Sequence, residues 1–108
     1  MELSKRFPKS FNLAIALAES YKKLRKFADS VQKYRYALEL QPNSEGTWFN
    51  LGILLQDQDD ADGALDCYKT VLRLNPKNAG AHNNLGGIAS ANDQEELAVE
   101  SYKNAVKI

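Results

Sequence analysis

Any catalytic chemistry in this chain would have to use a very small set of reactive side chains. The sequence contains one cysteine, Cys67, and one histidine, His82. A Ser-His-Asp or Cys-His arrangement would therefore have to run through His82, and we assign this residue a packing role because histidines are commonly half-buried. Cys67 occupies the same position of the internal repeat described below as Lys33 and Ser101, so we expect it to be partly exposed. Nothing beside it in the sequence would lower its pKa, so we expect a structural thiol. The sequence predicts no enzyme.

A cluster of carboxylates invites a calcium interpretation. It consists of Asp57, Asp59, Asp60 and Asp62. A calcium-binding loop counted from Asp57 would need a glycine where Asp62 stands and a closing glutamate where Tyr68 stands. We therefore expect a solvated turn between two helices, with no metal site. Gly86 and Gly87 lie inside a helical pattern rather than after a strand, so they form no phosphate loop. No cofactor is implied.

The composition is that of one small globular domain. Of 108 residues, 44% are apolar and 26% are charged, and 14 basic residues balance 14 acidic ones. This balance argues against nucleic acid or an anionic membrane as the main partner. No apolar run is long enough for membrane insertion, and the short apolar stretch after residue 10 makes a poor cleaved signal. A cytoplasmic location is the default for such a chain.

The charge is unevenly distributed along the chain. Residues 1–54 carry nine basic and five acidic side chains, whereas residues 55–108 carry five basic and nine acidic ones. The two halves therefore have net charges of +4 and −4. Such an asymmetry could orient neighbouring copies or a charged partner, although solvated helix faces are the simpler interpretation.

An internal repeat determines the expected fold. A constant shift along the chain, equal to the step from Leu17 to Leu51, superimposes side chains of matched size and polarity. The shift aligns Leu17, Leu51 and Leu85, then Tyr34, Tyr68 and Tyr102, and then Leu38, Leu72 and Val106. Such a period indicates a repeat architecture. We expect three units, at residues 11–44, 45–78 and 79–108, after a lead segment at residues 1–10.

Each unit has the pattern of two helices. Apolar residues recur at helical spacing, and the run of aspartates interrupts them in the middle unit. Asp60 is a candidate N-cap for the second helix there, and Asn43 and Asn78 are candidate caps for the helices that follow Pro42 and Pro76. Small residues such as Gly52 would let the paired helices approach closely, and the repeated tyrosines would fill the space between hairpins.

These residues resemble the tetratricopeptide repeat family. The middle unit carries its motif in Trp48, Leu51, Gly52, Leu55, Ala64, Tyr68 and Pro76, with Val71 in place of an alanine. The first unit has Ala14 in the tryptophan position and Ser30 in an alanine position, and the third has His82 and Ala89 at two motif positions. The resemblance implies an all-α fold, a right-handed α-solenoid of three helix-turn-helix hairpins with about six helices.

The resemblance also implies a binding surface for an extended peptide or a partner helix. In such arrays the first helix of each hairpin lines a concave groove. Its expected lining is Asn12, Ile15, Glu19, Phe49, Asn50, Ile53, Gln56, Asn83, Asn84 and Gly87. Amides can pair with any peptide backbone, while Phe49 and Ile53 can shelter an apolar side chain. The leading hypothesis is a non-enzymatic protein-interaction module.

Two subfamilies narrow the choice of partner. Arrays that hold the acidic tails of heat-shock chaperones use Lys, Asn, Asn, Lys and Arg, and the corresponding residues here are Asn12, Ala16, Asn50, Gly80 and Asn84. Because the cations are missing, chaperone tails are not expected partners. Asn50 and Asn84 are similar to the asparagine ladder of O-linked N-acetylglucosamine transferases. The chain could therefore be the substrate-presenting arm of a larger enzyme.

The last expected helix, at about residues 94–108, is followed by no capping helix. Solenoids normally cover their final apolar face with one. Two explanations fit: the chain is part of a longer array, which we favour, or the open end pairs with another copy. A self-associating scaffold would use Leu97, Tyr102, Val106 and Ile108.

Overall fold

The computed structural model describes residues 10–107, which form six helices joined by short turns. In chain order these are α2 (Phe11–Lys23), α3 (Phe27–Leu40), α4 (Glu45–Asp57), α5 (Ala61–Leu74), α6 (Ala79–Ala91) and α7 (Glu95–Lys107). The expectation of an all-helical chain of about six helices is confirmed. Ile108 and all of the predicted lead segment except Ser10 lie outside the described residues.

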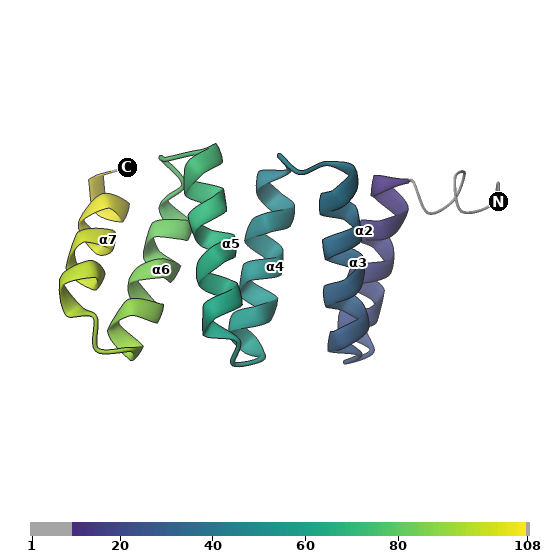
Figure 1. Ribbon diagram of the computed structural model, residues 1–108, viewed down its shortest axis with the longest axis horizontal. Coiled ribbons are helices and arrows are strands. Elements are labelled where there is room, and N and C mark those ends of the chain that lie inside the picture. Colours follow the sequence, from purple (N-terminus) through teal and green to yellow (C-terminus); the bar gives the residue numbers. More distant parts are fainter. Residues whose placement is uncertain (1–9, 108) are drawn as a thin grey trace.

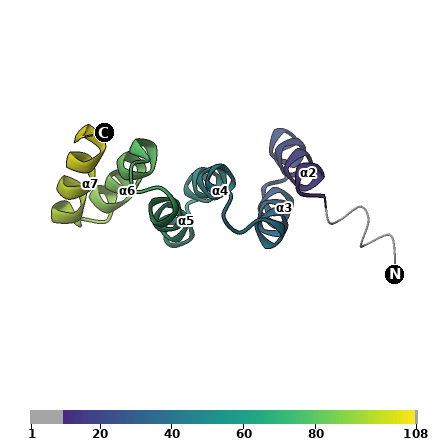
Figure 2. The ribbon, with the colours of Figure 1, turned by 90° about the horizontal axis from the view of Figure 1, so that it is seen from above.

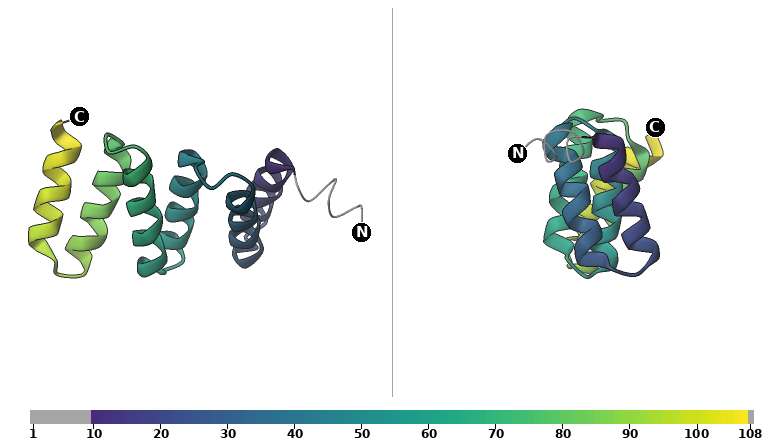
Figure 3. Two further views of the ribbon diagram at one scale, coloured as in Figure 1. Left: turned by 45° about the horizontal axis from the view of Figure 1, so that its top comes forward. Right: turned by 90° about the vertical axis from the view of Figure 1, so that its right-hand side faces the viewer.

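The helices stand side by side in one row (Figure 1). They pack as three hairpins, α2 with α3, α4 with α5 and α6 with α7, and successive hairpins stack through α3 on α4 and α5 on α6. Seen from above, α2, α4 and α6 lie along one side of the row, and α3 and α5 lie along the other (Figure 2). The oblique and end views in Figure 3 show the same stack lengthwise and nearly end-on. The result is an elongated helical solenoid that measures 51 × 26 × 18 Å.

Polar side chains begin several of these helices at matching positions. Ser10 and Asn78 are the N-caps of α2 and α6, and each accepts a hydrogen bond from the backbone N–H three residues further on, at 3.1 and 2.9 Å. Asp60 caps α5 in the same way at 3.0 Å. Each cap satisfies a backbone donor that the first helical turn leaves unpaired. The predictions for Asp60 and Asn78 are confirmed.

The predicted cap at Asn43 is wrong. The N-cap of α4 is Ser44, the next residue along the chain, and Asn43 is exposed. The repeat explains the difference, because Ser44 occupies the same position of its unit as Ser10 and Asn78 do in theirs. The Ser44 side chain does not bond to the helix backbone, and its hydroxyl instead shares a 2.8 Å hydrogen bond with that of Thr47.

One residue in each hairpin turn adopts a left-handed backbone conformation. Arg25, Asp59 and Asp93 have φ values of 62°, 63° and 60°, and they too occupy one matching position of the repeat. A left-handed residue lets the chain leave one helix and reverse direction within a short turn. The same turn geometry is therefore built three times, from residues other than glycine.

The core depends on close contact between paired helices. Tyr34 and Tyr68 are almost fully buried. A Cβ atom on Gly52 would lie 2.8 Å from the ring of Tyr68, and one on Gly86 would lie 2.7 Å from the ring of Tyr102. The rings of Tyr68 and Tyr102 thus pack directly against the glycine of the preceding helix, which confirms the predicted role of Gly52. Ser30 fits the buried alanine position because its hydroxyl donates to the Ala18 carbonyl at 2.7 Å.

The junctions between hairpins carry a repeated hydrogen bond. Trp48 donates from Nε1 to the Pro42 carbonyl at 2.7 Å, and His82, at the same position of the next unit, donates from Nε2 to the Pro76 carbonyl at 2.9 Å. His82 is half-buried at the start of α6, as a packing residue would be. No helix within residues 10–107 combines the length and apolar character needed to cross a membrane.

Candidate functional site

The single thiol is inside the protein rather than on its surface. Cys67 is 2% exposed, so the expectation of partial exposure is wrong. Its Cβ is 3.1 Å from the place that a Cβ on Gly52 would take, because the close packing of α4 on α5 encloses it. Burial raises the pKa of the Cys67 thiol to about 11, against a smaller opposing effect of Arg35. The thiolate needed for nucleophilic chemistry is therefore disfavoured.

The aspartate cluster serves the turn between α4 and α5. Asp59 is the left-handed residue, and Asp60 caps α5. All four aspartates of the cluster are exposed. Over the described part of the chain, no three histidine, cysteine, aspartate or glutamate side chains are placed to share a metal ion.

The predicted binding residues lie on α2, α4 and α6, and we call this set the first-helix face. Its exposed members are Asn12, Glu19, Asn50, Ile53 and Asn83. Its half-buried members are Ile15, Phe49, Gln56, Asn84 and Gly87. These three helices lie along one side of the solenoid (Figure 2).

Three members of this face meet at a residue that sequence reasoning assigned to packing alone. The Tyr68 hydroxyl donates to Oε1 of Gln56 at 2.8 Å and accepts from Nδ2 of Asn84 at 3.3 Å. The Phe49 ring packs against the Tyr68 ring with centroids 5.9 Å apart and planes tilted by 56°. Tyr68 therefore connects α4, α5 and α6. Its residue type could have indicated these hydrogen bonds in the sequence, because a buried tyrosine usually finds a hydrogen-bond partner.

These hydrogen bonds orient both amides. Tyr68 uses the oxygen of Gln56 and the nitrogen of Asn84, which leaves the Gln56 Nε2 group as a donor and the Asn84 Oδ1 atom as an acceptor. Burial raises the pKa of Tyr68, so its hydroxyl keeps its proton and remains the donor to Gln56. The two neighbouring helices thus present one donor and one acceptor from fixed side chains.

A shallow hollow of about 190 Å³ lies next to Gln56. Its lining is Gln56, Asp59, Ala61, Gly87, Ile88, Ala91 and Asn92. It combines two predicted face residues with the α4–α5 turn and the end of α6. The periodicity of the sequence does not predict this hollow, because its shape depends on how the α4–α5 turn packs against α6.

The first hairpin lacks the equivalent hydrogen bonds. Over residues 10–107, the Tyr34 hydroxyl is the buried side-chain polar atom without a partner. The positions that correspond to Gln56 and Asn84 are Lys22 and Asn50, and both side chains are exposed. Burial raises the pKa of Tyr34, with a smaller contribution from the charge of Glu19. The hydrogen-bonded part of the face is therefore on α4 and α6.

The residues proposed for self-association divide into three groups. Tyr102 and Val106 are exposed on α7, with 40% and 85% of their surface accessible. Leu97 is half-buried, and Ile108 lies outside the described residues. Val99, which the sequence analysis did not assign to this surface, lies beside Tyr102 and Val106.

Comparison with known families agrees with the repeated architecture. The tetratricopeptide repeat family matches residues 47–78, and a second model of that family matches residues 67–100. The chain belongs to the tetratricopeptide repeat family. The hairpin formed by α2 and α3 precedes both matches and has the same fold as the tetratricopeptide hairpins that follow it.

Solved structures of MamA share the fold of this tetratricopeptide chain. One superposes with a TM-score of 0.90 at 15% identity, covering 96% of this chain and 61% of MamA. Another has a TM-score of 0.86 at 23% identity, covering 97% of this chain and 57% of MamA. The chain thus spans about three fifths of the length of these proteins. No curated protein sequence matches it. Family and fold together support a protein–protein interaction module.

Proposed function

We propose that this protein binds an extended peptide segment of a partner protein on the first-helix face, chiefly over α4 and α6. The observation that carries the proposal is the pair of amides oriented by Tyr68. Gln56 keeps a free donor and Asn84 keeps a free acceptor, and an extended peptide offers the complementary carbonyl and N–H groups along its backbone. Such contacts depend little on the peptide's sequence.

Apolar groups beside the amides would add selectivity. Ile53 is 36% exposed on α4, and Phe49 is half-buried one turn earlier on the same helix. Phe49 is held from behind by Tyr68 and by the start of α6, since a Cβ on Gly80 would lie 3.0 Å from its ring. A rigid aromatic side chain binds at a low cost in conformational entropy. We expect ligands with one apolar side chain among small or polar ones.

The test begins with selection of binders from a random library of displayed twelve-residue peptides. Asn50→Ala combined with Asn84→Ala should weaken the selected peptides at least tenfold, because the variant removes hydrogen bonds that the ligand would otherwise make. Binding is measured by isothermal titration calorimetry or fluorescence anisotropy, and helicity by circular dichroism.

The matched control is Gln32→Ala, which removes an exposed amide from α3, outside the first-helix face. It should leave affinity unchanged. Because Asn84 also bonds to Tyr68, Asn50→Ala alone provides a variant whose fold is undisturbed. Equal affinities for the wild type and the double variant would contradict the proposal.

A further inference from the structure

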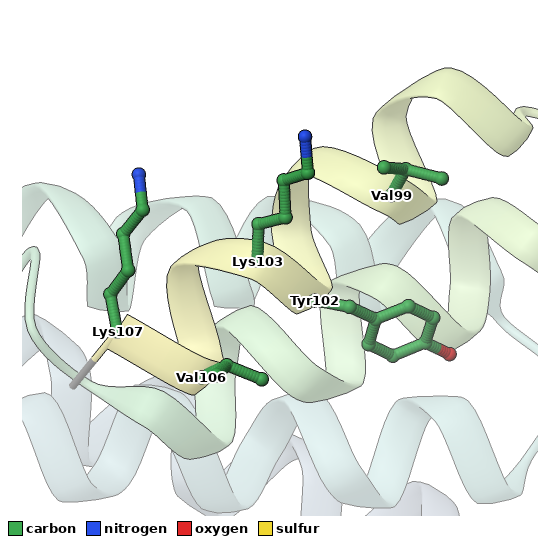
Figure 4. A pocket seen from close by; sticks show the side chains of 5 residues that line it. All are labelled: Val99, Tyr102, Lys103, Val106 and Lys107. Atoms are coloured by element: carbon green, nitrogen blue, oxygen red, sulfur yellow. The ribbon is translucent and has the colours of Figure 1, made fainter.

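The two adjacent glycines of α6 have different surroundings. A Cβ atom on Gly86 would lie 2.7 Å from the Tyr102 ring, so close packing excludes a larger residue there. For Gly87 the nearest atom to such a Cβ would be the Tyr102 hydroxyl at 3.8 Å, an ordinary contact with the side chain shown in Figure 4. Glycine weakens a helix relative to alanine, and at Gly87 no close packing requires it.

Glycine at this position leaves space open on the first-helix face. Gly87 lines the hollow of about 190 Å³ next to Gln56, which we call the α4–α6 hollow. The matching residue of α4 is Ile53, and that of α2 is Glu19. Because Gly87 forms part of the wall, a side chain of either size there would take up part of the hollow. The glycine therefore keeps the hollow open.

The walls of the α4–α6 hollow combine apolar and charged groups. Ala61, Ile88 and Ala91 supply apolar surface, and Asp59 supplies a carboxylate. Apolar walls suit the methylene stem of a long side chain, and a carboxylate suits a positively charged head group. A metal ion would find too few ligands, because no three histidine, cysteine, aspartate or glutamate side chains within residues 10–107 are placed to share one.

The two helices that border the hollow both end beside it. α4 ends at Asp57 and α6 ends at Ala91, and neither of these helices has a basic residue in its last turn. The carbonyl groups at a helix C-terminus favour a positive charge. By contrast, α2 carries Lys22 and Lys23 in its last turn. A cation in the hollow would therefore supply to α4 and α6 what α2 has in its own sequence.

The charges of the neighbouring turns have one sign. Residues 56–62, from the end of α4 to the start of α5, include four acidic residues and no lysine or arginine. Residues 91–96, around the α6–α7 turn, include three acidic residues and again no lysine or arginine. The corresponding turn of the first hairpin, at residues 22–26, instead carries four basic residues and no acidic one. Negative charge is thus concentrated at the hollow, where it would attract a basic group.

We propose that the α4–α6 hollow holds the arginine or lysine side chain of the segment that binds on the first-helix face. Because the occupant is a residue of the bound segment, this proposal rests on the proposed function. Gln56 connects the two, since its free donor would hold the peptide backbone and its side chain also lines the hollow. Asp59 would pair with the basic head group, while the apolar wall would contact the stem. The bound segment thus needs one basic residue in register with Gln56.

The first test uses a small basic probe without a peptide. N-acetyl-arginine amide is titrated into the protein and followed by heteronuclear NMR, with N-acetyl-citrulline amide as an uncharged probe of similar shape. The arginine probe should shift the backbone amide signals of Gly87 and Asn92, which line the hollow, and the shifts should saturate at millimolar concentrations. The citrulline probe should shift these signals much less, because it lacks the charge that the hollow favours.

Two variants alter the hollow in different ways. Asp59→Asn removes the charge and should weaken binding of the arginine probe about fivefold, while asparagine readily adopts the left-handed conformation of Asp59. Gly87→Ile gives α6 the residue that α4 has at this position and should abolish the response by filling the hollow. Its melting temperature should equal or exceed that of the wild type, because isoleucine favours a helix more than glycine does. The control is Glu39→Gln, the same loss of charge at an exposed residue of α3, which should bind like the wild type.

The second test uses the peptides selected for the first-helix face. They should share one arginine or lysine, and replacing it with citrulline or norleucine should weaken binding to the wild type about fivefold. The same replacement should change binding to Asp59→Asn little, because the pair is already broken. Fluorescence anisotropy measures all four combinations of peptide and protein.

The outcomes separate this proposal from the proposed function. Selected peptides that bind the first-helix face without a basic residue would overturn the proposal and leave the proposed function intact. An arginine response in the hollow without any peptide ligand would overturn the proposed function and leave the preference of the hollow for a basic group. Equal responses to the arginine and citrulline probes, or equal arginine binding by Asp59→Asn and the wild type, would exclude a basic side chain as the occupant.

Discussion

Tyr34 and Tyr68 occupy the same position in successive hairpins, but their hydroxyl groups have different surroundings. The Tyr68 hydroxyl bonds to Gln56 and Asn84, while the Tyr34 hydroxyl is buried without a partner among residues 10–107. A buried hydroxyl without a hydrogen bond loses its hydration and gains nothing in return. The two residues therefore offer a matched comparison within one fold.

We expect Tyr68→Phe to destabilise the protein by about 1 kcal/mol, because two amides lose their partner. Tyr34→Phe should be neutral or should stabilise the protein by up to about 1 kcal/mol, because it removes only an unpaired hydroxyl. Urea unfolding followed by circular dichroism measures both. Equal losses of stability in the two variants would contradict this account of the hydroxyl groups.

The sequence predicted where these tyrosines pack but not what their hydroxyl groups bond to. The repeat placed each tyrosine between hairpins, because matched size at a fixed period indicates a packing position. It did not predict the hydrogen bonds of Tyr68, which depend on Gln56 and Asn84 at positions where the first hairpin has Lys22 and Asn50. It also misplaced Cys67, because the alignment of that position with a lysine suggested solvent, while the approach of α5 to Gly52 encloses the thiol.

At the level of helices and turns, we expect the left-handed turn residues to be sensitive to substitution. Asp93 has φ of 60° in an exposed turn between α6 and α7. Asp93→Gly should stabilise the protein by roughly 0.5–1 kcal/mol, because glycine adopts this conformation without steric cost. Asp93→Ala should destabilise it by about 1 kcal/mol, because a Cβ atom is disfavoured there. Thermal unfolding of the three proteins should rank them glycine, aspartate, alanine.

The reverse order of the alanine and glycine variants would mean that helix propensity at the end of α6 outweighs the conformational preference of the turn.

The helices themselves were predictable, because capping side chains, periodic apolar residues and turns recur in every unit of the repeat. Asn43 was misassigned because two adjacent residues are both good caps, and only the register of the repeat separates Ser44 from it. The turn conformation had no signal in residue type, since Arg25 and Asp93 share one geometry.

At the scale of the whole solenoid, a carboxylate connects the second and third hairpins. Glu45 at the start of α4 accepts hydrogen bonds from Asn75 at 2.9 Å and from Asn78 at 2.7 Å, both in the segment between α5 and α6. These bonds hold the pKa of Glu45 below its usual value. A carboxyl with a lowered pKa stabilises the folded state above its unfolded-state pKa, and this contribution is lost as the pH falls through the folded-state value.

Comparison with Glu45→Gln isolates this effect from the other acidic groups. The wild type should be the more stable protein at pH 6, and the difference should shrink below about pH 4.5 as Glu45 becomes protonated. Chemical unfolding of both proteins between pH 6 and pH 3 measures the difference. A difference that does not change with pH would show that the ionised form of Glu45 does not stabilise the junction.

The hydrogen bond from Trp48 to Pro42 makes the protein's single tryptophan an optical probe of one junction. In a linear array each hairpin contacts only its neighbours, so hairpins can separate without unfolding the whole chain. Separation of α3 from α4 would expose the indole to water and shift its emission to longer wavelength, while the helical signal changed little. Fluorescence therefore reports the opening of the first hairpin specifically, and its disagreement with ellipticity would measure how cooperative the array is.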